Sequence, residues 1–260
     1  MAIIRLHPDT GKSVPSDISN LIGTDVVFEG IECAPRKVAP DAIRDPEHIR
    51  MIKDWCIDNG KYRDNLLICM GFGCGLRASD LQPLRVGHLL GFDKDNQLIY
   101  KDEFYTIEKK TTKRRKIYIT EEIREAANLY FRSCAGRRSL DLNTYLFMSE
   151  SNHGSNKPLS VDAISDVLAK IVKELNLPYH VSSHTLRKTF GYQFMLNYVD
   201  EFGEHNTDKA LVILQKILNH HDVKDTLRYI GITDQEIKNT CNNMYGRGND
   251  YRRERMTKAN

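Results

Sequence analysis

The chain has 260 residues, of which 40% are hydrophobic and 28% charged, and its formal net charge is +3. This is enough apolar material for one substantial core or two modest ones. No apolar run approaches the ~18 residues of a membrane span, and the first residues lack the pattern of a signal peptide. The weak net charge leaves nucleic acid binding open, because a binding surface needs only a local excess of cations.

The six cysteines are scattered along the chain without a Cys-x-x-Cys pair. Cys56 and Cys69 lie in apolar helical patterns, where a buried free thiol is expected. We therefore expect a reduced, cytoplasmic protein with neither a disulfide framework nor a structural zinc site.

Residues 1–44 contain several prolines and glycines and show no sustained periodicity, so loops or short strands are expected there. A helical domain is predicted to begin at Asp45-Pro46, because this pair is typical of an N-cap and a first helical turn. A second helix, near residues 63–72, is predicted to stop at Gly73 and Gly75.

The stretch from about residue 86 to residue 120 differs from its helical surroundings. It contains short strand-like runs separated by polar turns, which predict a small antiparallel sheet inserted among the helices. The runs are Leu89-Leu90, Leu98-Ile99-Tyr100, Phe104-Tyr105-Thr106-Ile107 and Ile117-Tyr118-Ile119.

Helices are predicted again after Thr120, which suits an N-cap and is followed by two glutamates where the helix dipole favours negative charge. The later helical segments are 160–177, 184–198, 208–218 and 233–245. The fold class expected is α+β, mainly helical with a small antiparallel sheet. The expected division is a short N-terminal segment (1–44), one main domain (45–246) and a basic C-terminal tail (247–260).

The segment SSHTLRKTFGYQFML carries two residues with chemical potential. Leu186, Phe190 and Phe194 form one apolar stripe at about 100° per residue. Arg187 lies at the edge of this stripe, and His184 lies about 60° further round. A guanidinium beside a buried face is costly unless an anion or a carboxylate meets it. Taken alone, such residues more often have a structural role than a functional one. The arginine is then paired with a nearby acid, and the histidine is a core residue with its hydrogen bonds made.

The segment HHDVKDTLRYIGI predicts a short helix with Asp222 as its N-cap and with Val223, Leu227 and Ile230 as its apolar stripe. Tyr229 lies roughly 130° away from that stripe, so packing does not obviously engage its hydroxyl. Tyrosines in such positions are common on protein surfaces. Periodicity alone therefore does not select Tyr229 among the twelve tyrosines of the chain.

Two further features suit a phosphate backbone. The glycines of GFGCGLRASDL bring Arg77 to the start of a helix, where backbone N–H groups and a forked guanidinium both bind phosphate. The run EKKTTKRRK holds six cations in nine residues between two strand-like segments. Each has a simpler interpretation, as a surface arginine after a helix end and as a solvated turn. The cations that would contact DNA are Lys109, Lys113, Arg114 and Arg115.

The order and spacing of these features together resemble the catalytic signature of the tyrosine recombinase (phage integrase) family, over residues 45 to 246. The matching motifs are Gly-Leu-Arg77-x-x-Asp80-Leu, a Lys110-x-x-Lys113-x-Arg115 hairpin, His184-x-x-Arg187, and Leu218-x-His220 followed nine residues later by Tyr229. The resemblance implies a full catalytic set, with Lys109 or Lys113 as alternatives for the hairpin lysine. The set is Arg77, Lys110, His184, Arg187, His220 and Tyr229, supported by Asp80.

Two positions depart from the family pattern. The usual Leu-Gly-His is here Leu218-Asn219-His220, and asparagine tolerates the left-handed conformation that glycine would adopt. Members of the family usually carry an N-terminal helical core-binding domain, for which residues 1–44 are too short. This departure concerns how the protein clamps DNA rather than the chemistry.

The resemblance also implies a reaction. Tyr229 attacks a phosphodiester and forms a 3′-phosphotyrosyl bond, which a 5′-hydroxyl later reverses. Two arginines neutralise the phosphate, His184 helps to deprotonate the tyrosine, His220 donates a hydrogen bond and Lys110 protonates the leaving 5′-oxygen. No metal, ATP or other cofactor is implied. The expected partner is double-stranded DNA, bound by a homotetramer on synapsed sites. No membrane is expected as a partner.

Three alternatives remain. A type IB topoisomerase uses similar chemistry to relax supercoils, and a plasmid relaxation assay separates the two. A non-catalytic DNA-binding regulator of the same family would be expected to lack catalytic residues, whereas every position is filled here. A metal-dependent nuclease built on His220 and His221 would need acidic partners at ligand spacing, and the sequence offers none.

Overall fold

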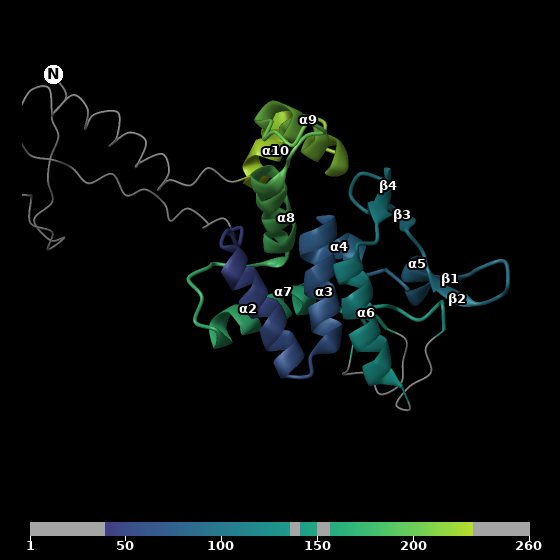
Figure 1. Ribbon diagram of the computed structural model, residues 1–260. Coiled ribbons are helices and arrows are strands. Elements are labelled where there is room, and N and C mark those ends of the chain that lie inside the picture. Colours follow the sequence, from purple (N-terminus) through teal and green to yellow (C-terminus); the bar gives the residue numbers. More distant parts are fainter. Residues whose placement is uncertain (1–39, 136–140, 150–156, 231–260) are drawn as a thin grey trace, which may run out of the picture. The chain divides into compact units, whose positions relative to one another are not determined.

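The computed structural model describes residues 40–135, 141–149 and 157–230, without the side chains of 228–230, and all of them belong to one compact unit that begins at Pro40 (Figure 1). They form a mainly helical α+β fold, as the sequence predicts. The helices are α2 (Pro46–Asp58), α3 (Tyr62–Cys74), α4 (Ala78–Leu81), α5 (Val86–Leu89), α6 (Glu121–Cys134), α7 (Val161–Glu174), α8 (Ser183–Asn197), α9 (Thr207–Ile217) and α10 (Val223–Ile230). No helix in these ranges is long and apolar enough to cross a membrane.

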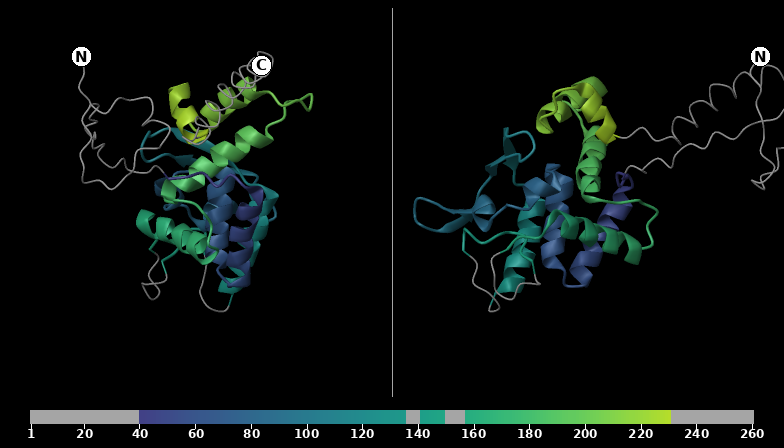
Figure 2. Two further views of the ribbon diagram at one scale, coloured as in Figure 1. Left: turned by 90° about the vertical axis from the view of Figure 1, so that its left-hand side faces the viewer. Right: turned by 180° about the vertical axis from the view of Figure 1, so that it is seen from behind.

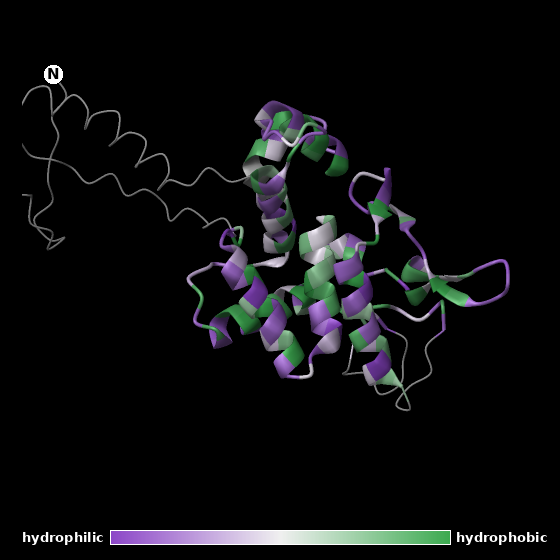
Figure 3. Cartoon of the chain, viewed as in Figure 1, coloured by the Kyte–Doolittle hydropathy of each residue, from purple (hydrophilic) through white to green (hydrophobic). Residues whose placement is uncertain are grey.

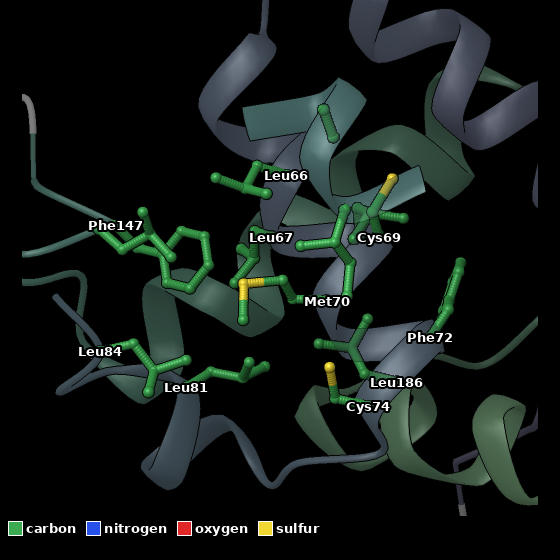
Figure 4. Packing of buried hydrophobic residues seen from close by; sticks show 14 of the residues in the cluster. Leu66, Leu67, Cys69, Met70, Phe72, Cys74, Leu81, Leu84, Phe147 and Leu186 are labelled. Atoms are coloured by element: carbon green, nitrogen blue, oxygen red, sulfur yellow. The ribbon is translucent and has the colours of Figure 1, made fainter. Parts of the chain in front are cut away.

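Helix α3 is the centre of the core. Ten of its thirteen residues are buried, so it is covered on all sides, and α2, α6 and α8 pack against it. Leu67 and Met70 of α3 lie among side chains from other elements, including Phe147 and Leu186 (Figure 4). The surrounding helices α2 and α6 instead mix polar and apolar residues (Figure 3), as amphipathic helices do.

The helix ends follow local chemistry. Asp45 accepts the N–H of Glu47 and Thr120 accepts that of Ile123, so both predicted N-caps are confirmed. Helix α3 continues through Gly73 and is capped by Gly75 in the left-handed conformation (φ 58°). The predicted stop at Gly75 is therefore confirmed, whereas Gly73 does not end the helix, which runs two residues beyond the predicted end at residue 72.

The strand region forms two separate sheets rather than the single sheet expected. Strands β1 (Leu90–Phe92) and β2 (Leu98–Tyr100) form one antiparallel pair, and β3 (Glu103–Ile107) and β4 (Arg114–Tyr118) form another. In the second pair Phe104 and Ile117 lie opposite each other and are buried, while Tyr105 and Lys116 lie opposite each other and are exposed. The alternation directs one face of this hairpin to the core.

Helices α8, α9 and α10 gather at the C-terminal end of α3 (Figures 1 and 2). Helix α8 packs against α3, and both α9 and α10 pack against α8. The predicted helices 184–198 and 208–218 agree with α8 and α9 within one residue at each end. The predicted helix 233–245, the segment 1–39 and the tail 247–260 lie outside the described residues.

The four described cysteines are free thiols buried in the core, as expected for Cys56 and Cys69. Burial is the main cause that raises the pKa of both thiols to about 12. Both side chains therefore act as small apolar residues rather than as nucleophiles.

Two glycines of α3 differ in the space around them. A Cβ on Gly71 would lie 2.9–3.1 Å from side-chain atoms of Leu186, so this glycine lets α8 approach α3 closely. A Cβ on Gly73 would meet only Ile123 Cδ1, at 3.8 Å. We expect Gly71→Ala to lower the free energy of unfolding by about 1–3 kcal/mol through overpacking.

Gly73→Ala is the matched control for that measurement by chemical denaturation. Alanine is the better helix former and has room there, so this substitution should raise the free energy of unfolding by roughly 0.5–1 kcal/mol. Equal effects of the two substitutions would contradict close packing at Gly71.

Candidate active site

Arg187 connects three helix ends at the candidate site. It lies in the second turn of α8, whose N-terminus is capped by Ser182, and its side chain is fully buried. Its Nη1 donates to the carbonyl oxygen of Gly75 at 2.9 Å, and its Nη2 donates to that of Leu218 at 2.7 Å. These carbonyls follow the last residues of α3 and α9, where helices carry partial negative charge. The buried guanidinium is therefore stabilised by backbone oxygens of two other helices.

Gly75 is needed at this junction for two reasons. Its φ of 58° lies in the left-handed region, and a Cβ would lie 2.3 Å from the ring of Phe190. Phe190 is three residues after Arg187 on α8, so the same close approach delivers the arginine to the Gly75 carbonyl.

Arg77 and Asp80 come from the N-terminus of α4. Arg77 donates from Nη1 to Oε2 of Glu108 at 3.0 Å, and Asp80 Oδ2 lies 3.9 Å from the same nitrogen. The other carboxylate oxygen of Asp80 accepts the backbone N–H of Lys109 at 2.8 Å. Asp80 thus lies against Arg77, as the family resemblance implies, and also binds the strand hairpin.

Glu108 was not expected to belong to the site. Its carboxylate is fully buried and lies among three guanidiniums. Oε1 lies 3.5 Å from Arg115 Nη1 and 3.7 Å from Arg187 Nη1, and Oε2 accepts from Arg77. Burial alone would raise the pKa of Glu108, but the Thr111 hydroxyl and the nearby arginines together lower it below the usual value. Glu108 is therefore an ionised counter-charge.

The hairpin cations occupy two different environments. Lys109, Lys110 and Arg114 are exposed, and Arg114 stacks over the Tyr105 ring at 3.8 Å. Arg115, which was expected to contact DNA, is instead 4% exposed. Its Nη1 donates to the Gly75 carbonyl at 3.2 Å and its Nη2 to the Cys74 carbonyl. Because β4 alternates, Arg115 points to the core with Ile117, so we assign it to the support of the arginine cluster.

His220 is placed by a strained residue before it. Asn219 adopts φ 53°, so it takes the left-handed conformation expected where the family has glycine. His220 Nε2 lies 3.2 Å from Arg187 Nη2, and Nδ1 lies 3.0 Å from the hydroxyl of Thr226. Burial, then Arg187 and Arg77, lower the pKa of His220 to about 4. The ring is therefore neutral at pH 7, with Nε2 accepting from Arg187.

His184 is exposed in the first turn of α8. Desolvation and then the charges of Arg77, Lys188, Arg187 and Lys110 lower its pKa below the ordinary value, so its ring is neutral at pH 7 and can accept a proton. The cations that lower this pKa include both site arginines and the hairpin lysine.

Tyr229 lies on α10, three residues after Thr226, and its side chain is outside the described residues. Thr226 is fully buried and holds α10 to His220. Asp222 accepts the N–H of Lys224, so the predicted N-cap of this helix is confirmed. The structure therefore brings Arg77, Arg187 and His220 together and connects the Tyr229 helix to them.

The chain is also similar to known proteins. The model of the phage integrase family matches residues 44–236. The chain belongs to this family. The probable integrase/recombinase YoeC of Bacillus subtilis is 33% identical over 78% of this chain and 96% of its own length. Transposase A of transposon Tn554 from Staphylococcus aureus is 28% identical over 75% of this chain, which spans 50% of that relative.

Solved structures show the same fold. The crystal structure of XerA recombinase has a TM-score of 0.57 and 18% identity, covering 78% of this chain and 65% of that one. The XerH site-specific recombinase bound to palindromic difH substrate has a TM-score of 0.56 and 14% identity, covering 84% and 57%. As a member of the phage integrase family, the chain is a tyrosine recombinase by class.

The metal-nuclease alternative does not suit this integrase site. In the described parts of the chain no three His, Cys, Asp or Glu side chains are grouped to hold a metal ion. Both ring nitrogens of His220 lie within 3.2 Å of other groups, and one of these is the Arg187 guanidinium. A cation beside that guanidinium would be repelled.

The lowered pKa of His220 predicts a pH dependence of stability. The unfolded pKa is near 6.5 and the folded pKa about 4, so below pH 6.5 the unfolded state binds more protons. The free energy of unfolding should therefore fall as the pH decreases from about 6.5 towards 4. Denaturation at several pH values should show a smaller fall for His220→Asn. A pKa near 6.5 for His220, measured by nuclear magnetic resonance titration, would contradict this assignment.

Proposed function

We propose that the chain is a site-specific DNA recombinase that cleaves and rejoins double-stranded DNA through a 3′-phosphotyrosyl bond to Tyr229. The supporting observation is that arginines from two distant motifs, Arg77 and Arg187, converge on one buried carboxylate. His220 contacts Arg187 and, through Thr226, the helix of the proposed nucleophile. Two preorganised guanidiniums suit a phosphate that gains charge in the transition state.

The proposed roles follow from charge and proton state. Arg77 and Arg187 bind the non-bridging oxygens, and neutral His184 accepts the phenol proton of Tyr229. Lys110 protonates the 5′-oxygen as the bond to phosphorus breaks. His220 donates to the phosphate from Nε2 in its other tautomer. This tautomer gives up the hydrogen bond from Arg187 and accepts one at Nδ1 from the Thr226 hydroxyl, which can act as donor or acceptor.

The proposed assembly is a homotetramer on two synapsed DNA sites, acting in the cytoplasm. Support for DNA as partner comes from family membership and from relatives whose structures contain it, such as the XerH complex with difH. The exposed cations Lys109 and Arg114 and the half-buried Lys113 supply the backbone contacts of the hairpin.

The role of Tyr229 is tested by removing one oxygen. Tyr229→Phe should abolish the covalent protein–DNA adduct on a nicked suicide substrate, because the phenol is the nucleophile, and should leave DNA affinity within about twofold. Tyr118→Phe is the matched control, since this exposed tyrosine lies on β4 and should keep full adduct yield. An adduct formed by Tyr229→Phe would disprove the assignment.

The hairpin contacts are tested by salt dependence. Lys113→Gln with Arg114→Gln should weaken DNA binding and reduce the slope of log K against log salt by about 0.9 per lost phosphate contact. Lys170→Gln removes an exposed cation from α7 instead and serves as the control. An unchanged slope in the hairpin variant would remove these residues from the DNA interface.

A further inference from the structure

Glu108 has no part in the chemistry proposed above, yet its carboxylate lies at the centre of the site. Its two oxygens have different neighbours. Oε2 accepts from Arg77 at 3.0 Å and from the Thr111 hydroxyl at 2.7 Å. Oε1 faces Arg115 and Arg187 at 3.5 and 3.7 Å. One carboxylate therefore binds a phosphate-binding arginine and the hairpin turn through the same oxygen.

The turn that carries Lys110 closes around Glu108. The N–H of Glu108 donates to the Lys113 carbonyl at 3.0 Å, and its own carbonyl accepts the N–H of Thr112 at 2.8 Å. Thr112 adopts φ 54°, in the left-handed region, which sets the path of the turn. Backbone hydrogen bonds thus define the turn, and the Glu108 side chain attaches it to the helical domain.

Lys110 is held on both sides by carboxylates that also neighbour Arg77. Its predecessor Lys109 donates its N–H to Asp80, and its successor Thr111 donates its hydroxyl to Glu108. Both acids lie within 3.9 Å of the same nitrogen of Arg77. The backbone of an exposed lysine is therefore set relative to the arginine that binds the phosphate.

We propose that Glu108 is a positioning residue that delivers Lys110 to the scissile phosphate by fixing the hairpin turn to Arg77. This inference rests on the proposed function. In the step concerned, the Tyr229 oxygen forms a bond to phosphorus, the bond to the 5′-oxygen breaks, and the Lys110 ammonium gives its proton to that oxygen. A misplaced turn leaves the arginines on the phosphate but the leaving oxygen without its acid.

The leaving group distinguishes this role from a purely structural one. A substrate with sulfur in place of the bridging 5′-oxygen releases a thiolate, and thiols have a pKa near 8.5, far below that of an alcohol. A thiolate departs without a proton, so loss of the general acid has little effect on it. Damage to the arginines or to the fold slows cleavage of both substrates.

The experiment compares single-turnover cleavage of matched oxygen and sulfur substrates by the full chain. Glu108→Gln keeps the size of the side chain and removes its charge. We expect it to slow cleavage of the oxygen substrate about 10²-fold, in the range of a lost general acid, and cleavage of the sulfur substrate by less than about threefold. Lys110→Ala should show the same rescue. Glu103→Gln, on the same hairpin, should match the unmodified protein.

Thr111→Val is the second variant, because it removes the hydroxyl on Glu108 and keeps the charge among the arginines. Its cleavage of the oxygen substrate should be slowed less than that of Glu108→Gln, and the sulfur substrate should restore its rate. This variant keeps the test informative even if Glu108→Gln does not fold. The positioning role is overturned if Thr111→Val, or a folded Glu108→Gln, slows cleavage of both substrates equally. This conclusion requires that the sulfur substrate restores cleavage by Lys110→Ala. The proposed function and this inference are overturned together if the sulfur substrate does not restore cleavage by Lys110→Ala. The same holds if the unmodified protein forms no covalent adduct with DNA.

Discussion

The buried guanidinium of Arg187 is the interaction on which the site depends. Moving such a charge out of water costs several kcal/mol unless its donors are met. Here they are met by the carbonyls of Gly75 and Leu218 and by the ring of His220. The bonds that offset this cost also fix the ends of α3, α8 and α9 relative to one another. Correct folding of the core and assembly of the site are therefore one event.

The second constraint is the concentration of positive charge. Arg77, Arg115 and Arg187 surround Glu108, and their mutual repulsion is reduced by the carboxylates that lie among them. Asp80 on α4 and Glu108, the residue after β3, supply this negative charge from two different parts of the chain. The hairpin is thereby tied to the helical domain by electrostatics as well as by the apolar contacts of Phe104 and Ile117.

Sequence reasoning predicted the helices well because their signals are local: Asp45 and Thr120 cap the helices they were expected to cap. The division into two sheets was missed, since three-residue strands carry little alternation and their pairing is not local. Glu108 was missed, and Arg115 was assigned to DNA contact instead of the core, because a run of charges does not state which side faces the core. The period of β4 did contain that information, because Arg115 lies two residues before the buried Ile117. The phenol of Tyr229 lies outside the described side chains, so its role still depends on motif order.

The carbonyl of Gly75 accepts from both Arg115 and Arg187 at the negative end of α3. Arg187 is consequently oriented by the protein before any phosphate arrives, and part of its charge is already balanced. In the proposed reaction, such a site would have a low reorganisation energy as negative charge develops on the phosphate. The same balance makes its attraction for the resting phosphodiester modest. For the proposed reaction, the free energy that holds DNA in place therefore has to come from surfaces other than the arginine cluster.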